Sequence, residues 1–260
     1  MGGGAAIPLR PKLLASIVRA AVTAAGDVPV TIKFRLGIDA DRMTFLDSGR
    51  IAEDEGCAAV GLHARTAADL YDGEADWEAI DELKASIDIP VLGNGDIQEA
   101  HDALRMMRQT GCDGVIVGRG CLGRPWLFRD LSDVFDGHEP QVPPSFGEVL
   151  DVMFAHVRRL VDWFGEDYAI PSFRRHLSWY TKGFTLSHDS RVGMMHAQTL
   201  DDLELVFRDV DRAQSFPQSA VRVKRGKRSG RQQVALPEGF LDVAASELLQ
   251  EDAELLVSGG

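Results

Sequence analysis

The sequence predicts a parallel α/β fold, followed by an all-helical region. Short apolar strands are expected to begin near residues 28, 58, 89 and 114, and a segment with helical spacing follows each of them. Two of the strand-to-helix turns, at 94–96 and 118–120, are rich in glycine. Beyond residue 139 only helical patterns recur, which indicates a second, all-α region.

The elements of the first region follow from their residue patterns in order. Residues 1–10 are rich in glycine and predict a loop, and apolar residues at helical spacing predict a helix over 11–25 that ends at Gly26. The further expected elements are strand 28–34, helix 43–55, strand 58–62, helix 77–86, strand 89–93, helix 97–110, strand 114–117 and helix 122–135.

A proline-containing linker over 139–144 leads into the second region. Helices are expected there over 146–163, 172–183 and 200–210. A basic segment with Gly and Ser spans 218–233, and an acidic tail with a short helical pattern over 240–256 follows it. The predicted division is therefore 1–138, 139–215 and a C-terminal extension over 216–260.

Composition limits the function classes. The net charge is −12 and the pI is about 5.0, which argues against nonspecific nucleic-acid binding but leaves room for a local basic face. Three cysteines without CxxC spacing predict neither a metal site nor a disulfide framework, and they suit a reducing cytoplasm. With no apolar run near 18 residues, we expect a cytoplasmic protein without a membrane partner.

The two glycine turns predict a phosphate site. Such turns leave backbone N–H groups available, and the N-terminus of the following helix adds its positive dipole end. In an eight-stranded β/α barrel, the loops after strands seven and eight typically build this site. The alternative is that these are ordinary turns in which glycine serves only close packing.

Polar residues end each of the four strands. The carboxyl ends of parallel strands share one face, where ligands bind. A lysine, a histidine and an arginine from separate strands, beside a phosphate site, favour an anionic aromatic ligand; the alternative is that each merely caps a neighbouring helix. These residues are Lys33, Arg35, His63, Arg65, Asn94, Asp96 and Arg119.

These motifs resemble the tRNA-dihydrouridine synthases, and the bacterial branch in particular. The similarity runs in order from Gly2 to about Leu205, with motifs at matching spacings. It implies an FMN enzyme that uses NADPH to reduce the C5–C6 bond of uridines in tRNA. The motifs are Lys33-Phe34-Arg35-Leu36-Gly37, His63-Ala64-Arg65-Thr66 with Tyr71 and Gly73, Asn94-Gly95-Asp96, and Gly118-Arg119-Gly120.

The resemblance also assigns roles by position. It implies flavin contacts for Lys33 and His63 and a place near the target uridine for Arg65 and Tyr71. The ribityl phosphate would be held by Asn94, Gly95, Asp96, Gly118 and Arg119.

The family's catalytic cysteine belongs to an Asn-x-Gly-Cys-Pro motif that precedes the glycine-rich loop with which this sequence opens. By position, that cysteine would lie upstream of Met1, so we expect a truncated chain with no catalytic residue of its own. The resemblance therefore implies the C-terminal half of a TIM (β/α)8 barrel followed by a small all-α domain. Cys121 matches no catalytic position, and we expect it to be a small packing residue.

The segment 174–183 resembles the family's helical tRNA-binding domain. Arg174, Arg175 and Lys182 are its candidate tRNA contacts, and the spacing predicts that Arg175 and Lys182 lie two helical turns apart on one face. Phe173, Leu177 and Tyr180 recur at i, i+4 and i+7, so they should pack inward. A basic stripe of this kind can also be a solvated face.

Two other functions stay open. The chain could be an FMN barrel oxidoreductase acting on a small molecule, as in dihydroorotate-type dehydrogenases, although the basic helix and the all-α region argue against it. It could instead be a non-catalytic half barrel that binds phosphate or RNA.

Overall fold

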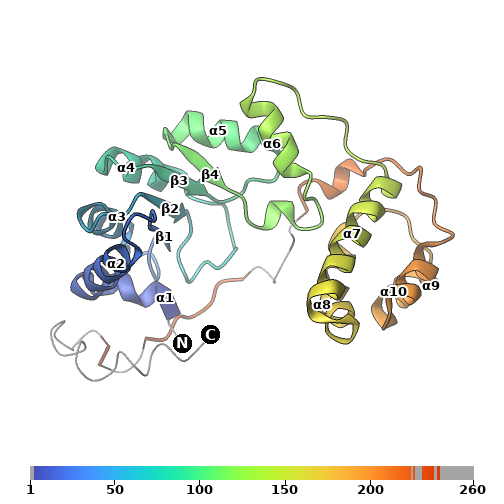
Figure 1. Ribbon diagram of the computed structural model, residues 1–260. Helices are drawn as coiled ribbons and strands as arrows, with labels where there is room; N and C mark the ends of the chain where they lie inside the picture. Colours follow the sequence, from blue (N-terminus) through green and yellow to red (C-terminus); the bar gives the residue numbers. More distant parts are fainter. Residues whose placement is uncertain (1–2, 224, 226–229, 237–238, 241–260) are drawn as a thin grey trace. The chain divides into compact units, whose positions relative to one another are not determined.

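Four parallel strands form the sheet on which the first part of the chain is built. In the computed structural model, which describes residues 3–223, 225, 230–236 and 239–240, the sheet order is β1-β2-β3-β4 (Figure 1). The predicted α/β class with four parallel strands is confirmed. The strands are β1 (Thr31–Arg35), β2 (Ala59–His63), β3 (Val91–Asn94) and β4 (Gly114–Ile116).

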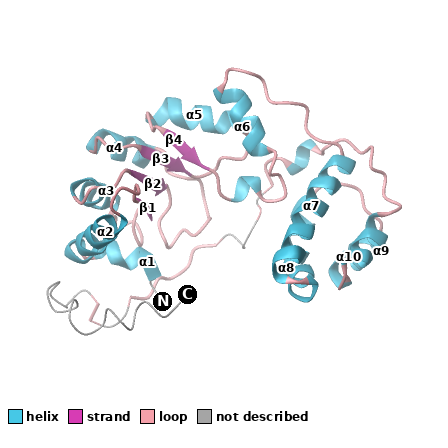
Figure 2. Cartoon of the chain, in the orientation of Figure 1, coloured by secondary structure: helices cyan, strands magenta, loops and turns pink. Residues whose placement is uncertain are grey.

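Helices alternate with the strands and cover one side of the sheet (Figure 2). Helix α3 contacts β1 and β2, and helix α4 contacts β3. The side chains of Val60, Leu62 and Val91 on this side are completely buried, so the apolar core lies between sheet and helices. The helices are α2 (Pro11–Ala25), α3 (Phe45–Asp54), α4 (Glu78–Ser86) and α5 (Ala100–Thr110).

The start of the chain differs from its prediction as a loop. The short helix α1 (Gly3–Ala6) and the 3-10 helix η1 (Ile7–Leu9) lie within residues 1–10. Pro8 is buried at a helix start, where its missing N–H costs nothing. Met1, the first residue of the predicted domain 1–138, lies outside the described residues, as does Gly2. The structure does not test the expectation that the family's cysteine lies upstream of Met1, which stays a prediction.

Three further predicted boundaries of this region are wrong, and one of them is the start of α5, at Ala100 instead of residue 97. Strand β1 begins three residues late, since Pro29 has no amide hydrogen to donate to a neighbouring strand. The helix expected from residue 122 begins at Leu127, after Pro125, because the residue before a proline is disfavoured in helical conformation.

Most of the second part of the chain is helical. Its helices α7 to α10 share one apolar core that includes Phe146, Met153 and Leu203. Two capping boxes, Ser145 with Glu148 and Thr199 with Asp202, begin α7 and α10. The helices of this part are α6 (Leu127–Phe135), α7 (Phe146–Phe164), α8 (Glu166–Tyr180), α9 (His188–His196) and α10 (Leu200–Phe207).

Helix α9 was not predicted, and the other helices differ from expectation at their ends. Only Met194 of α9 is buried, so the helix lacks the apolar stripe on which sequence reasoning depends. Helix α8 begins at Glu166 instead of 172 and ends at Tyr180 instead of 183. The acidic helix expected over 240–256 lies outside the described residues, apart from Phe240.

The chain forms two compact units, one of residues 1–97, 102–117 and 227–260, the other of residues 98–101 and 118–226. The sheet belongs to the first unit and helices α6 to α10 to the second. Among the described residues, no helix has the length and apolar character needed to cross a membrane.

Candidate functional site

The carboxyl ends of the strands bring three predicted polar residues into one row. Arg35 pairs with His63 across β1 and β2, and His63 pairs with Asn94 across β2 and β3. Residues in register on parallel strands point to the same face of a sheet. Arg35, His63 and Asn94 therefore form a polar row, whose last member donates from its Nδ2 to the carbonyl oxygen of Ile116 on β4 at 2.7 Å.

The polar row lies on the face of the sheet opposite the helices, because successive residues alternate between faces. Lys33, two residues before Arg35, shares this face and is paired with Gly61. A Cβ atom at Gly61 would lie 2.7 Å from Cδ1 of Ile116 and 3.2 Å from Cγ of Lys33. The glycine therefore allows the Lys33 and Ile116 side chains to approach each other over β2.

Tyr71 joins the polar row through the loop that follows β2. The guanidinium carbon of Arg35 lies 5.8 Å from the centre of the Tyr71 ring, and the His63 ring centre lies 6.2 Å from it. Arg35 also donates from Nη1 to the carbonyl oxygens of Thr66 (2.9 Å) and Leu70 (3.2 Å). Arg35 thus joins the end of β1 to the loop that carries Tyr71, the residue expected near the substrate.

Positive charge gathers on this face. Burial lowers the pKa of Lys33, and the nearby charge of Arg35 lowers it further. Burial is also the main cause that lowers the pKa of Arg35, with Tyr71 and Asp69 acting in the opposite direction. Two cations held together and partly desolvated favour an anionic or electron-rich ligand beside them.

Arg65 joins the end of β2 to the turn after β3. Its side chain is 2% exposed, and its Nη2 donates to both carboxylate oxygens of Asp96 at 2.9 and 2.8 Å. Nε donates to the carbonyl oxygen of Asp72 (3.1 Å) and Nη2 to that of Gly73 (2.8 Å). Asp96 also accepts from the amide of Ala75 at 2.7 Å. The Arg65–Asp96 pair therefore fixes both ends of the 66–75 loop.

The turn after β3 has the donor set for an anion. Gly95 (φ +146°) and Asp96 (φ +55°) adopt unusual backbone angles, and a Cβ at Gly95 would lie 2.5 Å from Cβ of Ala75. The buried Nη1 of Arg65 has no hydrogen-bond partner among the described residues. A buried guanidinium nitrogen without an acceptor, beside a glycine turn, fits a phosphate group.

The second glycine turn opens the second unit. Gly118 precedes the 3-10 turn η2 (Arg119–Cys121), where the Sγ of Cys121 lies 3.1 Å from the carbonyl oxygen of Gly118. Burial raises the pKa of the Cys121 thiol, which favours the unreactive thiol form. A Cβ at Gly123 would lie 2.4 Å from the carbonyl carbon of Trp179, so this loop packs directly on the end of α8.

The predicted tRNA contacts differ from one another in their surroundings. Arg175 on α8 is exposed, and Lys182 is exposed in the turn after the helix, so the two do not share a helical face. Arg174 is half-buried and donates from Nη2 to the carbonyl oxygen of Ala197 at 3.2 Å. The predicted inward packing is confirmed, because Phe173, Leu177 and Tyr180 are buried.

Two histidines and one arginine of the same helices were missed. The rings of His156 (α7) and His176 (α8) lie 5.0 Å apart, and Nδ1 of His156 lies 3.1 Å from the hydroxyl oxygen of Tyr180. Burial lowers the pKa of both imidazoles, and the charges of Arg159 and Arg175 lower the pKa of His156 and His176 respectively. Arg159 and Arg175 each lie near one of the two packed histidines, and we refer to these two arginines as the basic face of α7 and α8.

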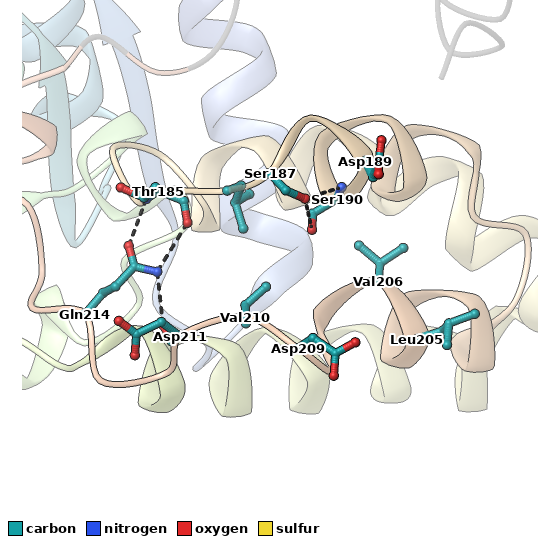
Figure 3. Close-up of a pocket in the computed structure, with 11 residues that line it drawn as sticks. Thr185, Ser187, Asp189, Ser190, Leu205, Val206, Asp209, Val210, Asp211 and Gln214 are labelled. Atoms are coloured by element: carbon teal, nitrogen blue, oxygen red, sulfur yellow. Dashed lines mark hydrogen bonds between the residues drawn. The ribbon is translucent and has the colours of Figure 1, made fainter.

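A separate pocket of about 750 Å³ lies between α9 and the end of α10 (Figure 3). Gln214 lies at one end of it and donates to the carbonyl oxygens of Thr185 and Asp211. Its carboxylates, which include Asp189 and Asp209, would repel phosphate, and it contains no predicted site residue. Within the described part of the chain, no three His, Cys, Asp or Glu side chains gather as metal ligands do.

The fold and the polar row define a parallel α/β protein with a cluster of polar side chains at the carboxyl ends of its strands. The protein-family model described as "Dihydrouridine synthase (Dus)" matches residues 1–215 of this chain. The chain belongs to this family, and the resemblance seen in its motifs is confirmed.

Similar proteins come from several bacteria. A "Probable tRNA-dihydrouridine synthase" of Mycobacterium tuberculosis (strain ATCC 25618 / H37Rv) is 49% identical over 262 residues, which cover 100% of this chain and 67% of that protein. The Mycobacterium leprae protein of the same name is 48% identical, with 68% of it covered. "tRNA-dihydrouridine synthase B" of Xanthomonas axonopodis pv. citri is 37% identical over 79% of this chain and 62% of that protein.

Proposed function

We propose that this chain carries the flavin and tRNA sites of a tRNA-dihydrouridine synthase, which reduces the C5–C6 bond of uridines in tRNA with NADPH as the reductant. The observation that supports this most directly is the polar row with Lys33 and Tyr71 beside it, in a member of the dihydrouridine synthase family. The chain spans about two thirds of the mycobacterial relatives named above.

The finer architecture is part of this proposal. The four-stranded sheet would be the C-terminal half of a TIM (β/α)8 barrel within residues 1–138, and residues 139–215 would form an all-α tRNA-binding domain. The shared core of α7 to α10 supports the second assignment. A cytoplasmic location, where tRNA is modified, belongs to the same proposal.

The residues on the strand ends fit FMN. Lys33 would place its ammonium against the electron-rich edge of the ring, and His63 would hydrogen-bond the ring from the neighbouring strand. Asn94, Gly95 and Asp96, with Gly118 and Arg119, would supply the amides and the charge for the ribityl phosphate. The chemistry that FMN would supply at this site is hydride transfer to the uridine.

The other side chains would position the substrate. Tyr71 presents an aromatic ring and a hydroxyl next to the polar row, which suits contact with an unstacked base. Arg65 would act indirectly, because its contacts with Asp96, Asp72 and Gly73 set the shape of the loop. A disturbance of Arg65 should therefore affect both the loop and the phosphate turn.

The basic face of α7 and α8 would contact tRNA phosphates. Arg159 and Arg175 supply charge there, Lys182 follows at the end of α8, and Arg174 lies beside Arg175 but is partly engaged by a carbonyl. Such contacts release counterions, so binding should weaken as salt rises.

The test is a reduction assay with unmodified tRNA, FMN and NADPH. Dihydrouridine formation, measured by mass spectrometry, together with matching NADPH consumption supports the proposal. Oxidation of the reduced protein by small enones and not by tRNA would favour the small-molecule oxidoreductase instead. Binding of both FMN and tRNA without turnover would still support the two sites, because none of Cys57, Cys112 and Cys121 lies in an Asn-x-Gly-Cys-Pro motif. Binding of phosphate or RNA without FMN would favour a non-catalytic binding module.

A further inference from the structure

Arg231 and Gln232 contact the loop that carries Tyr71. The backbone amide of Gln232 donates to the carbonyl oxygen of Ala68 at 2.8 Å, and its side-chain Nε2 donates to that of Ala67, also at 2.8 Å. Beside it, Nε of Arg231 lies 3.3 Å from a carboxylate oxygen of Asp69. Three successive loop residues are therefore held by two residues that lie far along the chain, Gln232 being 165 positions from Ala67.

The same loop residues are hydrogen-bonded on their other side to the turn that follows β1. The amides of Ala67 and Ala68 donate to the carbonyl oxygens of Gly37 and Ile38. Ala68 thus lies between two segments. Its amide donates to Ile38 and its carbonyl oxygen accepts from Gln232, as in the middle strand of a sheet. The extension supplies the outer hydrogen bonds of this short ladder.

The loop also carries strain that needs such support. Leu70 has φ +50°, an angle that L side chains rarely adopt. Its carbonyl oxygen and that of Thr66 accept from Arg35, and Tyr71 follows at once. The position of Tyr71 beside Arg35 and His63 therefore depends on what holds residues 66–70.

A second contact fixes the extension further along. The guanidinium of Arg10, which is buried, donates to the carbonyl oxygen of Phe240 and lies 4.1 Å from the centre of its ring. The family match ends at residue 215, whereas the mycobacterial relatives match this chain throughout. Arg231 and Gln232 thus lie beyond the family's matched region and contact a loop at the polar end of the sheet.

We propose that residues 230–236 form a strap that holds the 66–73 loop, with Gln232 and Arg231 acting as positioning residues for Tyr71. The strap acts through the backbone of Ala67 and Ala68 and through the carboxylate of Asp69. Its consequence for tRNA rests on the proposed function.

The first test is hydrogen–deuterium exchange of the whole chain. In the Gln232→Ala/Arg231→Ala variant, the amides of residues 66–73 should exchange roughly fivefold faster, because about one hydrogen bond and an exposed ion pair are lost. Gln232→Pro, which also removes the backbone donor, should exchange faster still. Gln233→Ala is the matched control, since no described side-chain hydrogen bond involves Gln233, and it should exchange like the parent. Unchanged exchange in Gln232→Pro overturns the strap.

The second test separates positioning from simple stability. In the tRNA reduction assay, the double variant should raise KM for tRNA several-fold and leave kcat nearly unchanged. If the double variant carries Arg231→Lys in place of Arg231→Ala, much of this rise in KM should disappear. A lower KM would mean that the extension obstructs the substrate, and an unchanged KM would mean that Tyr71 does not depend on it; either result overturns the proposal. A parent without activity refutes only the proposed function, because the exchange experiment still decides whether the strap exists.

Discussion

Replacing Arg65 with alanine tests the centre of the candidate site. The change removes two hydrogen bonds to the Asp96 carboxylate and leaves the carbonyl oxygens of Asp72 and Gly73 without their donor. Breaking a buried ion pair costs about 3–5 kcal/mol. Because the Asp96 side chain is 30% exposed, solvent reduces that cost, and we expect about 2–3 kcal/mol.

A loss of this size is readily measured. For a chain of this length it corresponds to a fall in Tm of roughly 5–10 °C, which a thermal melt followed by circular dichroism will resolve. Arg19→Ala is the matched control, because Arg19 also pairs bidentately with a carboxylate, that of Glu55, but is 66% exposed. Its Tm should change much less.

Asp96→Asn provides a second measure if the alanine variant does not fold. Asparagine keeps one acceptor in place of the carboxylate, so the loss should be smaller than for Arg65→Ala but larger than for Arg19→Ala. If the Tm of Arg65→Ala is the same as that of the Arg19→Ala control, the Arg65–Asp96 pair does not fix the loop and our reasoning about the site fails.

Three further predictions concern ligands and pH. Gly61→Val should weaken FMN binding in a fluorescence titration, because its side chain would displace those of Lys33 and Ile116; an unchanged Kd would contradict this. Arg175→Ala should lower the slope of log K for tRNA against log salt by roughly 0.7–0.9, whereas Arg158→Ala, whose guanidinium pairs with a carboxylate, should change it less. Since burial lowers the pKa of His156, the unfolded state binds more protons, and stability should fall as pH drops below about 6.5; urea unfolding should show a weaker pH dependence in His156→Gln.

The strands were predictable because their signal is local. The apolar runs and the spacing of the strand starts require no knowledge of distant residues, and polar residues at strand ends mark the ligand side of a parallel sheet. For this reason Arg35, His63 and Asn94 were expected on one face, and the register places them there. Helix α9 (188–196) could not be found in this way, because it buries only Met194.

The connections between elements could not be predicted. The pairing of Arg65 with Asp96 depends on the fold of a loop between them, and the contact of Gln232 with Ala67 joins residues 165 positions apart. His156 meets His176 only because α7 packs on α8. In each case the sequence shows the chemical groups, and the tertiary packing decides what they touch.

The close approach of Gly123 to α8 has a consequence for engineering this protein. Because a Cβ there would lie 2.4 Å from the backbone of Trp179, the loop after β4 and the end of α8 have shapes that suit only each other. A chimera that exchanged the helical region at the 139–144 linker would combine a loop from one parent with a helix from another. A junction between Val117 and Gly118 keeps the two together, so chimeras joined there should fold more often than those joined at the linker.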